Sequence, residues 1–177
     1  GNRDYYKLDT QTLTEWLVPI SLEGFTIFAT QYRKADQFGG ADLSDVLNLI
    51  RLAKNYPNID SSKIGMVGWS RGGLMTYLAL TKTNDIDCAI IGGSPTDMFQ
   101  LVSERPQMDS LFAKLIPYYK INRENELLKR SPSFWPDHLR KTHLLIIHGQ
   151  LDERASANHA TDMSKCLKKN NYAHKLM

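Results

Sequence analysis

The sequence has little cysteine, little net charge and no long apolar run. Two cysteines in 177 residues, Cys88 and Cys166, are too few for a disulfide framework, and both lie in apolar patterns that predict buried free thiols. The longest uncharged stretches, 72–81 and 142–151, are about half the length of a membrane-spanning helix, so we expect no membrane partner. A net charge of +3 with 42% hydrophobic residues excludes disorder and predicts one globular domain.

The basic residues are scattered along the chain and do not indicate a nucleic-acid partner. Their one short cluster, Lys165, Lys168 and Lys169, is typical of a solvated helix face, whereas nucleic-acid surfaces carry a denser basic stripe. Neither the cysteines nor the five histidines have metal-ligand spacing, so we expect no metal and no cofactor. Oligomeric state and compartment stay open, with the two free cysteines slightly favouring the cytoplasm.

Helical and strand-like patterns alternate along the chain. Amphipathic spacing predicts helices over 10–21, 42–54, 72–80 and 155–169. Short apolar runs predict strands at 25–30, 63–68, 86–91, 144–148 and 172–177. Apolar strands separated by helices indicate an α/β fold, with a mostly parallel sheet and helices on both faces.

Residues 94–140 depart from this alternation and are rich in proline and aromatic residues. We interpret them as a helical insertion or cap over the sheet, within a single domain that spans residues 1–177. Tyr118, Tyr119 and Trp135 could line an apolar pocket there. Packing between the cap and the core is the favoured interpretation of these three side chains.

The segment from Gly68 to Gly72 reads Gly-Trp-Ser-Arg-Gly, which matches G-x-S-x-G between a predicted strand and a predicted helix. In this context Ser70 occupies a sharp, strained turn that presents its hydroxyl as a nucleophile. Gly68 and Gly72 are expected because the chain folds back there and leaves no room for side chains. The amides of the following helix point at the site, and the backbone N–H of Arg71 is the natural first oxyanion donor.

A serine nucleophile needs a base, and the base needs a carboxylate to orient it. In this strand–turn–helix arrangement the acid follows the serine, in a loop beyond a later strand. Asp152 comes soon after the predicted strand 144–148 and is the candidate acid. Glu153 is the neighbouring alternative.

These segments resemble the prolyl oligopeptidase family (serine peptidase S9). Residues 63–73 resemble the family's nucleophile segment, and residues 28–33, 40–47 and 145–152 resemble further segments in the family's order. The resemblance runs from about residue 25 to the C-terminus. It implies an α/β-hydrolase catalytic domain that acts on a peptide or small ester substrate through an acyl-enzyme.

None of the histidines is well placed to be the base. His174 follows Asp152 in the expected order, but it begins a predicted strand, and the active site of a parallel sheet lies beyond the carboxyl ends of the strands. His148 lies at the correct edge but precedes Asp152, which favours a packed strand-end residue. Structural or exposed positions are expected for the remaining three, His138, His143 and His159.

We therefore expect a chain that is incomplete at both ends. The resemblance implies a second oxyanion donor before Gly1, and the missing histidine is expected beyond Met177. The 177 residues alone should then show little turnover. A serine peptidase of the prolyl-oligopeptidase type is the leading hypothesis; the alternatives are a carboxylesterase-like hydrolase and a non-catalytic α/β-hydrolase-like binding domain, which the absent base favours.

Overall fold

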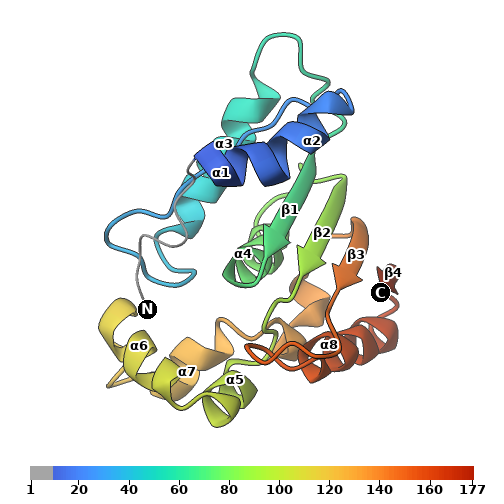
Figure 1. Cartoon of the computed structure of the whole chain (residues 1–177). Helices are drawn as coiled ribbons and strands as arrows, with labels where there is room; N and C mark the ends of the chain where they lie inside the picture. Colours follow the sequence, from blue (N-terminus) through green and yellow to red (C-terminus); the bar gives the residue numbers. More distant parts are fainter. Residues whose placement is uncertain (1–9) are drawn as a thin grey trace.

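The computed structural model describes residues 10–177, and these residues contain a four-stranded parallel sheet (Figure 1). The strands lie in sequence order: β1 (Gly65–Trp69), β2 (Cys88–Gly92), β3 (His143–Ile147) and β4 (His174–Leu176). Because all four are parallel, their carboxyl ends lie at one edge of the sheet. Loops that follow β1 and β3 therefore come together there.

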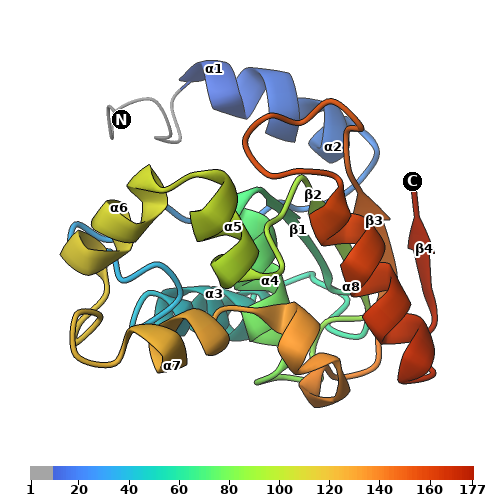
Figure 2. The same cartoon turned by 90° about the horizontal axis from the view of Figure 1, so that it is seen from below.

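Helices lie on both faces of the sheet, as the sequence predicts (Figure 2). One face is covered by α3 (Leu43–Lys54), α4 (Arg71–Leu80) and α8 (Asn158–Lys169). The other face is crossed near β1 by a continuous helical segment, made of α1 (Thr10–Thr12), the π-helical turn η2 (Leu13–Leu17) and α2 (Val18–Leu22). This segment contacts the sheet through the rings of Trp16 and Trp69, whose centroids are 6.3 Å apart.

The core lies between the sheet and the helices α3, α4 and α8. Alternate strand residues point into it, and Ile91 and Ile146, which are neighbours in the β2–β3 register, are almost completely buried. Every residue of α4 from Gly73 to Leu80 is buried, because α3 packs beside it and β1 and β2 lie beneath it. The helix that follows Ser70 is therefore held firmly on the sheet.

The apolar run at 25–30 predicts a strand, and this prediction is wrong. The structure has no strand there, and among the described residues β1 pairs only with β2. Phe28 instead packs against Tyr56, with ring centroids 5.4 Å apart in an edge-on arrangement. An apolar pattern gives a strand only where a neighbouring strand pairs with its backbone, which local sequence does not reveal.

The two cysteines are free, as predicted, but they are not both buried. Cys88 is exposed and Cys166 is half-buried. Cys88 is the first residue of β2, and its side chain lies on the sheet face that α4 and α8 leave uncovered, because its neighbour Ala89 points into the core.

Residues 94–140 form short helices below the carboxyl ends of the strands in Figure 1. They are α5 (Met98–Glu104), α6 (Gln107–Leu115), α7 (Arg123–Leu128) and the 3-10 turns η3 (Pro132–Phe134) and η4 (Pro136–His138). Tyr119 and Trp135 are buried in the core, and each donates a hydrogen bond, Tyr119 Oη to Asp109 (2.6 Å) and Trp135 Nε1 to the carbonyl of Leu128 (2.9 Å). Tyr118 is three-quarters exposed.

Tyr119 and Trp135 thus pack into the core, as the favoured interpretation predicts, whereas Tyr118 is exposed to solvent. The division of the chain into a domain and an insertion stays a prediction. No helix within residues 10–177 is long and apolar enough to cross a membrane.

Candidate active site

Ser70 lies in the turn between β1 and α4, with backbone angles φ 53° and ψ −117°. A positive φ with this ψ is uncommon for a residue with a side chain and stores about 1–3 kcal/mol of strain. The Ser70 N–H donates a 2.7 Å hydrogen bond to the carbonyl of Gly92 at the end of β2. The Ser70 hydroxyl does not cap α4 and has no hydrogen bond within residues 10–177, so it is available for chemistry.

The glycines around Ser70 differ in how tightly they are enclosed. A Cβ added to Gly68 would lie 2.2 Å from the carbonyl oxygen of Gly72, so the expected close approach at Gly68 is present. A Cβ on Gly72 would meet nothing closer than 3.8 Å, so the expectation that Gly72 has no room is wrong. The tight position is Gly73, whose Cβ would lie 2.6 Å from that of Ser94, because the first turn of α4 crosses the chain after β2.

The glycines therefore predict unequal effects of alanine. Gly68→Ala should destabilise the fold by roughly 1–3 kcal/mol, since backbone atoms must move to admit the methyl group. Gly72→Ala should be neutral or stabilise by up to about 1 kcal/mol, because alanine is the better helix former. Urea unfolding of both variants measures the difference, and equal losses would contradict it.

The backbone N–H of Arg71 is the first in α4. The first amides of a helix have no intrahelical acceptor, and the helix dipole gives that end partial positive charge. The N–H groups of Arg71 and Gly72 therefore lie beside the free Ser70 hydroxyl with no acceptor within the helix. This arrangement can stabilise negative charge that develops on an oxygen atom near Ser70.

Asp152 lies in the turn that follows β3. Its Oδ1 accepts hydrogen bonds from the backbone N–H groups of Arg154 (2.8 Å) and Ala155 (3.1 Å), which fix the carboxylate. Its Oδ2 accepts no hydrogen bond from the described residues and lies 3.7 Å from Nε2 of His148. One oxygen is thus anchored while the other can orient a base. The neighbouring Glu153 is exposed.

A pair of glycines at the end of β2 lies between the Ser70 turn and the Asp152 loop. The Trp69 ring occupies the space where a Cβ on Gly92 would be, at 2.1 Å. Gly93 has φ +51°, and its Cβ would lie 3.3 Å from Asp152 Oδ2 and 3.4 Å from the Trp69 ring. The sequence shows both glycines at a strand end, yet their part in bringing Trp69 and Asp152 together follows only from the order of strands.

His148 and His174, the two histidines weighed as a base from the sequence, both form hydrogen bonds through their rings. The ring of His148 is buried, and its Nε2 lies 2.8 Å from the carbonyl oxygen of Ala155. His174 is the first residue of β4, at the sheet edge opposite Ser70. Its Nε2 lies 2.7 Å from Ser164 Oγ and its Nδ1 lies 2.8 Å from the carbonyl oxygen of Tyr172.

The remaining histidines are structural or exposed. His138 and His143 are exposed, whereas His159 is fully buried in α8. The Nδ1 of His159 accepts hydrogen bonds from the backbone N–H groups of Thr96 (3.2 Å) and Asp97 (3.4 Å). Within residues 10–177 no histidine forms a hydrogen bond with Ser70.

Burial lowers the pKa of His159 below its ordinary value near 6.5, although the carboxylate of Glu104 opposes this shift. The folded protein keeps His159 neutral while the unfolded chain protonates it below that value. The stability this gives is complete above pH 6.5 and is lost as pH falls toward the folded pKa. We expect unfolding free energy to fall by up to about 1.4 kcal/mol per pH unit in that range. Urea unfolding at pH 7.5 and 5.5 should show a smaller decrease in His159→Asn.

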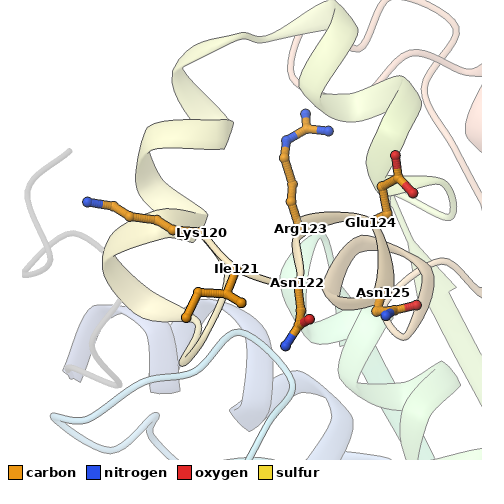
Figure 3. Close-up of a pocket in the computed structure, with 6 residues that line it drawn as sticks. All are labelled: Lys120, Ile121, Asn122, Arg123, Glu124 and Asn125. Atoms are coloured by element: carbon orange, nitrogen blue, oxygen red, sulfur yellow. The ribbon is translucent and has the colours of Figure 1, made fainter.

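None of these residues lines the cavity at the start of α7. It has a volume of about 340 Å³ and is lined by consecutive residues of one loop and the start of α7 (Figure 3): Lys120, Ile121, Asn122, Arg123, Glu124 and Asn125. A second, apolar recess of about 450 Å³ is lined by the first residues of β2, β3 and β4. Neither is lined by Ser70, Arg71 or Asp152. Among residues 10–177 no group of three or more histidine, cysteine or acidic side chains could hold a metal ion.

The parallel sheet, the strand–Ser70–helix turn and the acidic loop after β3 define an α/β-hydrolase fold. Residues 19–177 match the prolyl oligopeptidase family, also called Peptidase_S9, and the chain belongs to this family.

Relatives of known sequence and structure agree with this membership. The chain is 26% identical over 161 residues to the uncharacterized peptidase YtmA of Bacillus subtilis, and the match covers 86% of this chain and 62% of that protein. Pyrococcus horikoshii acylaminoacyl peptidase is 26% identical with a TM-score of 0.64, over 78% of this chain and 23% of that one. An acylaminoacyl peptidase in complex with Z-Gly-Gly-Phe-chloromethyl ketone is 25% identical with a TM-score of 0.68, over 80% of this chain and 23% of that one. The chain thus spans less than two thirds of the relatives it matches.

Proposed function

We propose that this chain carries the nucleophile and the acid of a serine peptidase. The observation that carries the proposal is Ser70, held at φ 53° with a free hydroxyl at the N-terminus of α4. Strain of this kind persists where the surrounding structure over-determines it, and such positions cluster at active sites. Membership of the prolyl oligopeptidase family supports the same function.

In the proposed mechanism Ser70 Oγ attacks the carbonyl carbon of the substrate while a histidine takes the hydroxyl proton. The carbonyl oxygen becomes an oxyanion that accepts a hydrogen bond from the backbone N–H of Arg71. The histidine returns the proton to the leaving amine, which departs and leaves an acyl-enzyme on Ser70. Water, activated by the same base, then releases the acid product.

Asp152 is the proposed partner of this base. Its anchored Oδ1 fixes the loop, and its Oδ2 can accept the Nδ1–H of a histidine and hold the ring in the correct tautomer. The base itself is proposed to be a histidine other than the five in this chain. His174 forms hydrogen bonds through both ring nitrogens, and His148, which is buried, forms one through Nε2 to the carbonyl of Ala155. None of the five histidines forms a hydrogen bond with Ser70 within residues 10–177.

We propose peptides rather than simple esters as the substrates. The relatives are named as peptidases, and one of them is bound to an inhibitor built on the blocked tripeptide Z-Gly-Gly-Phe. The helices of residues 94–140 lie over the carboxyl edge of the sheet, where they can contact a peptide chain on either side of the scissile bond.

Labelling by a fluorophosphonate probe tests this proposal in the full-length protein. The expected result is one label per molecule, on Ser70, together with faster cleavage of peptidyl amides than of p-nitrophenyl esters relative to the uncatalysed rates. Labelling with ester cleavage alone would indicate a carboxylesterase-like hydrolase. Absence of labelling in the folded protein would indicate a non-catalytic binding domain.

A further inference from the structure

The side chain of Arg71 joins the Ser70 turn to the loop of residues 36–42, which precedes α3. Its guanidinium donates hydrogen bonds to both carboxylate oxygens of Asp36 and to Oδ2 of Asp42 at 2.6 Å. It also lies over the rings of Tyr32 and Phe38, with its central carbon 3.6 and 4.9 Å from the ring centroids. These ion pairs are shielded from solvent, since the side chain of Asp42 is only 1% exposed and that of Arg71 19%.

The loop that receives Arg71 is itself firmly held. The N–H of Gly39 donates to the carboxylate of Asp42 at 3.1–3.2 Å, and the N–H of Phe38 donates to Asp36 at 2.7 Å. Arg130, two residues after the end of α7, donates a 2.7 Å hydrogen bond to the carbonyl of Phe38. The loop therefore gives the guanidinium of Arg71 a fixed support.

This support acts on the peptide group that the proposed mechanism needs. Ser70 is strained, and its own side chain contributes no hydrogen bond that would hold the turn. The next residue is Arg71, whose N–H is the proposed oxyanion donor. A bidentate arginine–carboxylate pair has a fixed planar geometry, so anchoring the side chain restrains rotation of the peptide between Ser70 and Arg71.

We propose that the Arg71 side chain is a positioning residue that holds the Ser70 hydroxyl and the Arg71 N–H in reactive geometry through Asp36 and Asp42. This inference rests on the proposed function. It assigns a role to the variable residue of the G-x-S-x-G motif, which the motif itself leaves open.

The test compares Arg71→Met with the wild type in the full-length protein. Methionine keeps an unbranched apolar stem but cannot form the ion pairs. We expect the second-order rate of fluorophosphonate labelling to fall roughly 10- to 100-fold, because small displacements of reacting groups slow a reaction by factors of this size. The endpoint should stay at one label per molecule. With a peptide substrate, kcat should fall and KM should change little, because the oxyanion contact forms only in the transition state.

Further variants identify the path through the carboxylates. Arg71→Lys keeps the charge but loses the planar fork, so its labelling rate should lie between those of the wild type and Arg71→Met. Adding Asp42→Asn to Arg71→Met should cause no further loss of rate, because both changes break the same contact. Arg33→Met is the matched control: Arg33 forms a bidentate pair with Asp45, exposed on the surface, and its loss should leave the labelling rate unchanged.

The outcomes separate this inference from the proposed function. An Arg71→Met protein that labels at the wild-type rate would overturn the positioning role and leave the peptidase proposal intact. An unchanged rate with a lowered endpoint would also overturn it, because that pattern shows loss of folded protein rather than displaced reacting groups. A wild type that is not labelled would overturn the proposed function, and this inference with it.

Discussion

Ser70→Ala is expected to abolish fluorophosphonate labelling of the full-length protein and to lower kcat for a peptide substrate by about 10⁶-fold, the size of effect that loss of a serine nucleophile has elsewhere. The fold should be unaffected. The Ser70 hydroxyl caps nothing and has no hydrogen bond within residues 10–177, so the unfolding free energy should change by less than about 0.5 kcal/mol. Labelling, steady-state kinetics and urea unfolding measure the three quantities.

Ser44→Ala provides the matched control for this experiment. Ser44 is an exposed serine in the first turn of α3, and its removal should leave both labelling and kcat at wild-type values. Equal labelling of Ser70→Ala and the wild type would show that the probe reacts elsewhere and would contradict the assignment of the nucleophile. A large loss of stability in Ser70→Ala would contradict the conclusion that the Ser70 hydroxyl forms no stabilising hydrogen bond.

Asp152→Asn is expected to lower kcat by about 10⁴-fold. The amide cannot balance the charge of the protonated base, and it can favour the wrong tautomer of the ring. Asparagine preserves the Oδ1 acceptor that receives the N–H groups of Arg154 and Ala155, so the loop should keep its conformation. Kinetics with a peptide substrate, together with thermal unfolding, distinguish lost chemistry from lost folding.

Glu153→Gln is the control for Asp152→Asn. The two carboxylates are adjacent in sequence, but Glu153 is exposed while Asp152 faces the glycines at the end of β2. We expect kcat in Glu153→Gln to stay within twofold of the wild type. A large loss in Glu153→Gln with normal activity in Asp152→Asn would assign the acid to Glu153.

Much of the fold follows from local sequence patterns. Each strand of the sheet overlaps a short apolar run, and α3, α4 and α8 overlap segments with helical spacing. These elements are predictable because their buried faces repeat with the period of the backbone. The segment 25–30 has an equally apolar pattern, but no strand pairs with it in the structure, so the information that decides its conformation is not local.

The candidate site is predictable where chemistry depends on a short motif. The turn at Ser70 and the acidic loop at Asp152 are each encoded by a few consecutive residues. The contacts around them are not. Gly73 rather than Gly72 is enclosed, and Arg71 reaches Asp36 and Asp42 some thirty residues earlier in the chain. Both features depend on how α4 crosses β2 and on where the loop before α3 lies, which spacing in the sequence does not specify.

The burial of α4 has a consequence for mutations far from the chemistry. The backbone conformation of Ser70 is unfavourable by itself by about 1–3 kcal/mol, so a force from outside the turn must maintain it. The packing of the buried residues from Gly73 to Leu80 against β1 and β2 holds the helix, and with it the turn, in place. We expect substitutions that loosen this packing, such as Leu74→Ala, to let the turn at Ser70 relax before the protein unfolds. We therefore expect the labelling rate of Ser70 to respond to changes in core packing more sensitively than the melting temperature of the protein does.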